Sequence, residues 1–130
     1  MPSPTDPCPC GLPAAYRACC GRLHDRRGSA TTAEQLMRSR YSAFAVHDEA
    51  YLLLTWHPST RPREVGFDPA IRWRGLDVLN TTRGRPHDDE GTVEFSARYT
   101  ALGRPGELRE NSRFVRHGGA WVYVDGVIAT

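Results

Sequence analysis

The stretch Val93-Glu94-Phe95-Ser96-Ala97-Arg98-Tyr99 alternates apolar and polar side chains. A period of two is typical of a β-strand that has one face in a core and the other in water. Runs with the same period occur at 71–78, 108–114 and 121–124. Turn residues separate these runs, so the sequence predicts a sheet of about four antiparallel strands.

Two details of these runs predict how the sheet is built. The apolar residues of 71–78 change parity at Gly75, which predicts a β-bulge in a bent strand. Gly118-Gly119 lies between the last two runs and predicts a tight hairpin, because glycine tolerates the backbone angles of such turns. One face of the run at 108–114 is expected to carry Leu108, Glu110, Ser112 and Phe114.

Two helices are predicted ahead of the sheet. Thr31 and Glu34 have the spacing of a capping box, so the first helix is expected to begin at Thr31. Its apolar residues recur at helical spacing, at Ala33, Leu36, Met37, Tyr41 and Phe44. A second helix is expected from about Asp48 to Trp56, because Pro58 disfavours helical geometry in the residue before it. Helices followed by an antiparallel sheet define the α+β class.

The overall composition is that of a globular protein. Hydrophobic residues make up 39% and charged residues 25%, and no run of 18 apolar residues occurs, so no membrane-spanning helix is expected. Residues 1–7 have neither a basic start nor an apolar stretch, so they predict no signal peptide, and their three prolines predict a flexible segment. The expected location is the cytoplasm, where thiols stay reduced.

Four cysteines form a cluster in the sequence: Cys8, Cys10, Cys19 and Cys20. Four sulfur ligands suit tetrahedral Zn²⁺ and leave no position for a catalytic water, so the cluster predicts one structural zinc ion. Two disulfides or unligated thiols are the alternatives, although adjacent Cys19 and Cys20 cannot bond to each other without strain. The predicted organisation is a zinc module at 8–21, a polar linker at 22–30 and an α+β domain at 31–130.

The distribution of charge argues against nucleic-acid binding. Residues 1–30 contain four arginines and two aspartates, and thus hold the whole formal net charge of +2. Four thiolates around one Zn²⁺ would add two negative charges to this segment. The metal-loaded chain is then nearly neutral, whereas nonspecific nucleic-acid binding needs a net positive face.

Residues 8–21 resemble the SEC-C motif, the zinc-binding tail of the preprotein translocase ATPase SecA; they read Cys-Pro-Cys-Gly-Leu-Pro-Ala-Ala-Tyr-Arg-Ala-Cys-Cys-Gly. The residues that match the motif are Cys8, Cys10, Gly11, Tyr16, Cys19, Cys20 and Gly21. In SecA the last ligand is commonly a histidine, and Cys20 stands at that place here. The resemblance implies a metal site, but this sequence lacks the lysines that usually accompany the motif.

Further segments resemble the YchJ family of small bacterial proteins; they lie at 32–44, 55–62, 110–114 and 121–126. With the SEC-C motif, the resemblance covers roughly residues 8–127. It implies a nuclear transport factor two-like fold, in which helices pack on a curved sheet and the cone-shaped domain encloses a cavity. It implies no particular activity.

Several side chains are expected to face the interior of this cone: Arg40, Tyr41, His57, Glu110, Ser112, Phe114 and Tyr123. Glu110 and His57 are the candidates for acid–base roles, because burial tunes the proton affinity of a carboxylate or an imidazole. The alternatives are structural. Glu110 would pair with a cation or hydroxyl, with Arg40 the first choice and His57 the second, or His57 would fix a helix end by a hydrogen bond.

Two classes of function follow from these patterns. One is a zinc-containing adaptor, whose metal module presents a rigid surface to a protein partner. The other is a small-molecule-binding protein or enzyme that uses polar groups in the cone, although no nucleophile-and-base motif, phosphate loop or dinucleotide fingerprint occurs. The interior separates the two: a filled apolar core favours the adaptor, and an open cavity with converging polar groups favours a binder or an enzyme.

Overall fold

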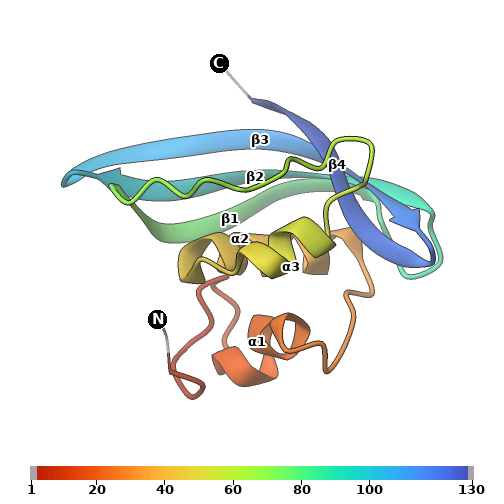
Figure 1. Ribbon diagram of the computed structural model, residues 1–130, viewed down its shortest axis with the longest axis horizontal. Coiled ribbons are helices and arrows are strands. Elements are labelled where there is room, and N and C mark those ends of the chain that lie inside the picture. Colours follow the sequence, from red (N-terminus) through yellow and green to blue (C-terminus); the bar gives the residue numbers. More distant parts are fainter. Residues whose placement is uncertain (1–2, 129–130) are drawn as a thin grey trace.

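The fold has three tiers, and the computed structural model describes it for residues 3–128 (Figure 1). A four-stranded sheet forms the first tier, and helices α2 (Ala33–Val46) and α3 (Glu49–Leu54) form the second. The N-terminal residues form the third tier, on the side of the helices away from the sheet. This order of helices and strands confirms the predicted α+β class.

All neighbouring strands of the sheet are antiparallel, in the order β1-β2-β3-β4. The strands span Ile71–Arg83, Glu90–Ala101, Arg104–His117 and Ala120–Ile128. The register of β1 against β2 shifts between Trp73 and Gly75, which confirms the predicted bulge. Gly118 and Gly119 form the turn between β3 and β4, with φ of 61° and 84°. Such positive angles cost a residue with a side chain about 1–2 kcal/mol each, which explains the glycine pair.

The N-cap of helix α2 lies one residue later than predicted. Thr32, rather than Thr31, accepts a hydrogen bond at the N-cap, from the backbone N–H of Gln35 at 3.0 Å. Gln35 Oε1 in turn accepts from the backbone N–H of Thr31 at 2.7 Å. The pairs Thr31/Glu34 and Thr32/Gln35 both fit the capping pattern, so the pattern does not distinguish the two registers.

Helix α3 ends two residues before the predicted end at Trp56. The reason is a short pairing of the chain with β4. The backbone N–H of Tyr123 donates to Thr55 O, and the N–H of His57 donates to Tyr123 O, both at 2.8 Å. These bonds hold the chain beside β4, so the helix stops and Trp56 is brought next to Tyr123.

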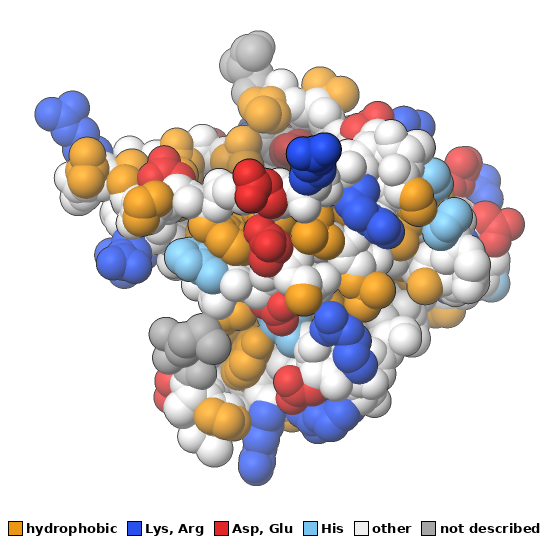
Figure 2. Space-filling model, viewed as in Figure 1, with side chains coloured by type: hydrophobic (Ala, Val, Ile, Leu, Met, Phe, Trp, Pro, Cys, Tyr) orange, Lys and Arg blue, Asp and Glu red, His pale blue; other side chains and the backbone are white. Residues whose placement is uncertain are grey.

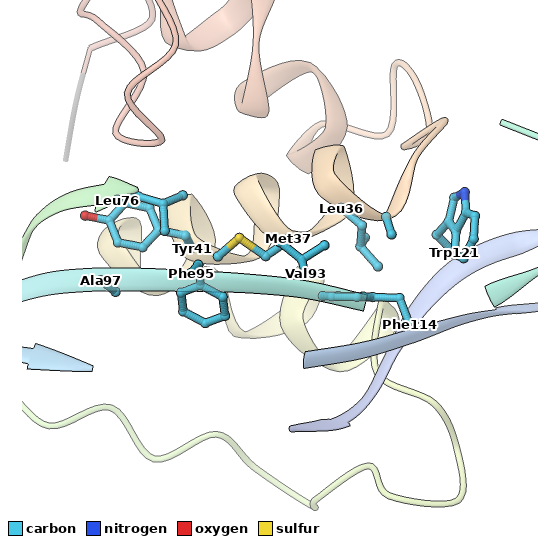
Figure 3. Packing of buried hydrophobic residues seen from close by; sticks show 10 residues of the cluster. Leu36, Met37, Tyr41, Leu76, Val93, Phe95, Ala97, Phe114 and Trp121 are labelled. Carbon is cyan, nitrogen blue, oxygen red and sulfur yellow. The ribbon is translucent and has the colours of Figure 1, made fainter. Parts of the chain in front are cut away.

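The main core lies between α2 and the sheet, and side chains of α2 point toward β2 (Figure 3). The buried residues of this core are Ala33, Leu36, Met37, Tyr41, Leu76, Val93, Phe95, Ala97, Phe114 and Trp121. Burial alternates along β3 from Glu107 to Phe114, so Leu108, Glu110, Ser112 and Phe114 share the inner face, as predicted. The chemistry of the inner face therefore depends on α2 and on this strand.

The third tier differs from the expected module followed by a linker. Helix α1 spans Cys20–His24 and crosses the expected boundary between 8–21 and 22–30. Leu23 and His24 are only 2% and 6% exposed. The first part of the segment expected to be a polar linker therefore packs inside the molecule.

Residues 3–7 also differ from the flexible segment predicted for 1–7, of which residues 1–2 lie outside the described part. The backbone N–H of Tyr16 donates to Asp6 O at 2.8 Å, and that of Arg17 donates to Pro4 O at 3.1 Å. These bonds attach residues 3–7 to the cysteine module.

The surface carries charges of both signs. On the face shown in Figure 2, acidic and basic side chains are interspersed. On the outer face of the sheet, Arg109 pairs with Glu94 at 3.2 Å and Arg113 pairs with Asp125 at 2.7 Å. Within residues 3–128, no helix has the length and apolar character needed to cross a membrane.

Candidate functional site

The four cysteine sulfurs lie within 4.8 Å of one another. The sulfurs of Cys10 and Cys19 are 3.7 Å apart. A tetrahedral zinc site with Zn–S bonds of about 2.3 Å places its sulfurs about 3.8 Å apart. The donor set and its spacing therefore fit one tetrahedral metal ion, and soft thiolates favour zinc over the hard cations.

Short local bonds bring the two cysteine pairs together. The backbone N–H of Gly11 donates to Cys8 O at 3.1 Å, which closes the turn that contains Cys10. The N–H of Cys8 donates to Ala14 O at 2.9 Å, so the chain folds back toward the second pair. A 3₁₀ turn at Tyr16–Ala18 follows, and Cys19 and Cys20 lie at the start of α1.

The electrostatics of the cluster call for a cation. Burial raises the pKa of the Cys19 thiol to about 12. Hydrogen bonds from the thiols of Cys10 and Cys20 lower the pKa of Cys8 below its usual range, and the backbone amides of the same two residues add to this effect. Four thiolates at such distances repel one another, so without a cation some of the thiols keep their protons. A bound metal ion would displace these protons and take their place.

Helix α2 carries the contacts that join the cysteine module to the rest of the fold. The Arg38 guanidinium donates from Nη1 to Cys10 O at 3.0 Å. The Ser42 hydroxyl lies 3.7 Å from the Cys8 sulfur. The cysteine cluster is therefore attached directly to the helix whose opposite side covers the sheet.

A buried histidine in α1 completes this attachment. His24 Nε2 lies 2.9 Å from Ser39 O, and a carbonyl only accepts, so Nε2 carries the hydrogen. His24 Nδ1 then accepts from the Tyr16 hydroxyl at 2.5 Å. Burial raises the pKa of Tyr16 to about 12, so this hydroxyl retains its proton. Tyr16 of the module, His24 of α1 and Ser39 of α2 thus form one hydrogen-bonded chain.

Replacing Tyr16 with phenylalanine should destabilise the metal-loaded protein by about 1–3 kcal/mol, because His24 Nδ1 would lose its buried donor. Urea unfolding measures the loss. The matched control is Tyr99→Phe, because the half-buried Tyr99 makes no side-chain hydrogen bond within residues 3–128; it should change stability by less than about 0.5 kcal/mol. Equal losses in the two variants would contradict the hydrogen-bonded chain.

A cavity of about 130 Å³ lies between α2 and the inner face of the sheet. Six aromatic side chains line it: Tyr41, Phe44, Trp73, Phe95, Phe114 and Tyr123. Five of the lining residues are only half-buried, so the cavity is open to solvent; they are Phe44, Trp73, Leu108, Glu110 and Tyr123. Arg40, Glu110 and Ser112 add polar groups to the wall.

Arg40 is held firmly in this wall and is only 6% exposed. Its Nη1 donates to Leu52 O at 2.8 Å and to Thr55 Oγ1 at 2.7 Å. The guanidinium carbon lies 4.8 Å from the ring centre of Trp56 and 4.7 Å from that of Tyr123. Burial lowers the pKa of Arg40 to about 10, so the side chain is still a cation at neutral pH.

Glu110 does not pair with Arg40, which corrects the first expectation for this carboxylate. Its Oε2 accepts a hydrogen bond from the Ser112 hydroxyl and a longer one from the Tyr123 hydroxyl at 3.4 Å. A β-carbon at Gly126 on the neighbouring strand would clash with this oxygen. The absence of a side chain at Gly126 therefore makes room for the carboxylate.

His57 lies outside the cavity, and this corrects its expected role as a second partner of Glu110 or as an acid or base there. Its Nδ1 accepts from the backbone N–H of Ser59 at 3.0 Å. Its ring packs edge-on against His117, with centroids 5.0 Å apart. The remaining predicted pocket residues do line the cavity: Arg40, Tyr41, Glu110, Ser112, Phe114 and Tyr123.

Sequence reasoning missed the groups that hold Arg40, namely Thr55 and Trp56. The sequence predicts a helix that includes both residues. In the structure Thr55 caps α3 and accepts from Arg40, and the pairing of Trp56 with β4 brings its ring to the guanidinium. Gly126 was missed as well, although a glycine within a strand often marks a place where another group approaches the backbone closely.

Two family models match the chain. One, described as YchJ, middle NTF2-like domain, matches residues 32–126, and the SEC-C motif matches residues 5–22. The chain belongs to the YchJ family. This confirms the resemblance seen in the sequence segments, and the SEC-C match covers all four cysteines.

Curated YchJ relatives carry the name UPF0225 protein. The one from Streptomyces avermitilis is 61% identical over 119 residues, which cover 92% of this chain and 82% of that protein. The one from Streptomyces coelicolor is 54% identical over 123 residues, covering 95% of this chain and 96% of that protein. The similarity therefore extends over both the cysteine module and the cone domain.

Two solved structures share the fold. The solution structure of a SEC-C motif containing protein from Rhodopseudomonas palustris has a TM-score of 0.82 at 33% identity, and covers 96% of this chain and 100% of that one. The crystal structure of a SEC-C motif containing protein from Psychrobacter arcticus has a TM-score of 0.79 at 26% identity, with 98% and 85% covered. The arrangement of module, helices and sheet is thus common to these proteins.

Proposed function

We propose that this YchJ protein binds a small molecule in the cavity between α2 and the sheet, and that a structural zinc ion holds α2 in place above it. The cavity is the observation that carries the proposal. Its aromatic wall contains a buried cation, Arg40, and a carboxylate, Glu110, in a space that opens to solvent. A few polar groups in a mostly apolar concave site are typical of small-molecule binding.

The zinc part of the proposal assigns one ion to the four cysteines. They would hold it through four Sγ atoms, and the closed coordination sphere gives the ion a structural role. Such an ion would offset much of the repulsion between the thiolates and link the two cysteine pairs of the N-terminal tier. Arg38 and Ser42 would then transmit this rigidity to α2, because they contact the cysteine turn directly.

The adaptor hypothesis receives less support from the geometry. A filled apolar core was its expected signature, and the cone contains a cavity instead. A protein partner of the cysteine module and a cytoplasmic location remain predictions from the sequence. Catalysis receives no support from His57, which lies away from Glu110 and outside the cavity.

The proposal predicts that filling the cavity abolishes binding of a single-ring probe. Toluene is the simplest probe, since a cavity of about 150 Å³ in another protein accommodates one benzene ring. Chemical shifts of the metal-loaded protein should change on titration with toluene for residues that line the cavity. Ala97 is 2% exposed and lines it, so Ala97→Leu should remove these changes.

The matched control is Ala50→Leu, which adds the same side chain on the exposed surface of α3. It should bind toluene as the unmodified protein does. Binding that survives in Ala97→Leu, or that is absent from the unmodified protein, would contradict the proposed site.

A further inference from the structure

The polar end of the cavity contains one charge of each sign. Arg40 is a buried cation and Glu110 supplies a carboxylate, yet no ion pair links them within residues 3–128. Their charges cancel over the cavity as a whole. A ligand with a net charge would upset this balance, and the cost would be largest at the buried Arg40, because Glu110 is half-buried.

Arg40 has hydrogen-bonding capacity left over. Its two described hydrogen bonds both come from Nη1. Its Nε and Nη2 have no hydrogen-bond partner within residues 3–128. Among the unpaired side-chain nitrogens and oxygens of this region, Trp56 Nε1 is fully shielded from solvent, whereas Arg40 Nε and Nη2 are not. The unused N–H groups therefore still reach open space, and the cavity is the space that Arg40 lines.

Glu110 has the complementary free capacity. Both hydrogen bonds to its carboxylate arrive at Oε2, from Ser112 and Tyr123. Oε1 accepts no hydrogen bond from residues 3–128, and it is not fully shielded from solvent. The cavity therefore offers a free donor edge on Arg40 and a free acceptor on Glu110.

The rest of the wall selects for a flat apolar body. Six aromatic side chains surround the space. Its volume of about 130 Å³ is close to that of a cavity known to hold one benzene ring, about 150 Å³. Aromatic walls favour another ring in offset-stacked or edge-on contact. The size and shape of the cavity thus restrict the apolar part of a ligand to about one ring.

We propose that the ligand class is an uncharged, flat, single-ring molecule with an amide-type group, whose carbonyl accepts from Arg40 and whose N–H donates to Glu110. This inference rests on the proposed small-molecule site. The free N–H groups of Arg40 and the free oxygen of Glu110 would then each have a hydrogen-bond partner when the ligand displaces water. The net charge of the cavity would not change. Carboxylates would meet repulsion from Glu110, and ammonium ions would meet repulsion from Arg40.

Four probes of similar shape test this inference: benzamide, benzoate, benzylamine and toluene. Calorimetric titration of the metal-loaded protein at neutral pH should give benzamide an affinity at least about tenfold higher than each of the others, because only benzamide satisfies both groups. Equal or tighter binding of benzoate or benzylamine would overturn the neutral class, and equal binding of toluene would overturn the amide. If no probe binds, the proposed function fails as well.

Glu110→Gln provides the second arm because it keeps the shape and removes the negative charge. Benzoate should gain at least about tenfold in affinity in this variant, since Arg40 then attracts it without opposition. The matched control is Glu107→Gln, on the outer face of the same strand, where the preference for benzamide should be unchanged. An unchanged ratio of benzamide to benzoate affinity in Glu110→Gln would overturn the assigned role of this carboxylate.

Discussion

Replacing Cys10 with serine is expected to abolish stoichiometric zinc binding. Cys10 is fully buried, and its sulfur lies 3.7 Å from that of Cys19. A serine hydroxyl is a poor ligand beside three thiolates, and structural zinc contributes about 10–16 kcal/mol to the folding of small modules. Elemental analysis after dialysis against a mild chelator should fall from about one zinc per chain to almost none.

Two further variants separate ligation from packing. Cys19→Ser changes a less buried cysteine and should lose the metal to the same extent. Ser42→Ala removes the hydroxyl beside Cys8 without removing a ligand, so it should retain the metal. Full zinc content in Cys10→Ser and Cys19→Ser, or disulfides linking all four cysteines of the purified protein, would contradict the proposed centre.

The same variant tests how far the metal supports the fold. In Cys10→Ser the amide signals of the N-terminal tier should lose dispersion, while those of β2 and β3 persist, because the core between α2 and the sheet is independent of the cysteines. Loss of all native signals would show instead that the cone domain cannot fold without its metal module.

Replacing Phe114 with alanine should produce the second large effect, a loss of about 3–5 kcal/mol in the free energy of unfolding. Phe114 is 2% exposed, belongs to the main core and also lines the cavity, so its removal enlarges an existing space. Neighbouring side chains cannot easily close that space because Arg40 is held rigidly above Tyr123. Denaturant unfolding of the metal-loaded protein measures the change.

Phe67→Ala is the matched control, since Phe67 is a half-buried ring at the edge of a different cluster. Its loss of stability should be clearly smaller. A loss below about 1 kcal/mol in Phe114→Ala would mean that the site collapses around the deletion, which would contradict a cavity with rigid walls.

The sequence correctly predicts those features of the fold that depend on residues close together in the chain. The alternation from Leu108 to Phe114, the bulge at Gly75 and the turn at Gly118-Gly119 each depend on a few neighbouring residues, and each agrees with the structure. The predicted N-cap of α2 is wrong by one residue because two overlapping capping patterns are present in the sequence. The cysteine spacing alone was enough to predict that four sulfurs converge.

The partners of Arg40 could not be predicted in this way. Leu52 and Thr55 reach Arg40 because α3 packs beside α2, and the rings of Trp56 and Tyr123 reach it because the chain after α3 pairs with β4. Coulomb attraction predicts Glu110 as the partner. In the structure the hydroxyls of Ser112 and Tyr123 bind this carboxylate instead, in the space that Gly126 leaves open. The polar chain around Leu23 and His24 predicts a linker, whereas the packing of the N-terminal tier against the helices buries both residues.

Intermolecular nuclear Overhauser effects between bound toluene and the metal-loaded protein test the central claim most directly. The proposed site predicts contacts from toluene protons to Met37 and Tyr41 of α2 and to Phe95 and Phe114 of the sheet, because these side chains line one space from opposite sides. Contacts confined to other surfaces, or none at saturating toluene, would contradict a ligand site between the helix and the sheet.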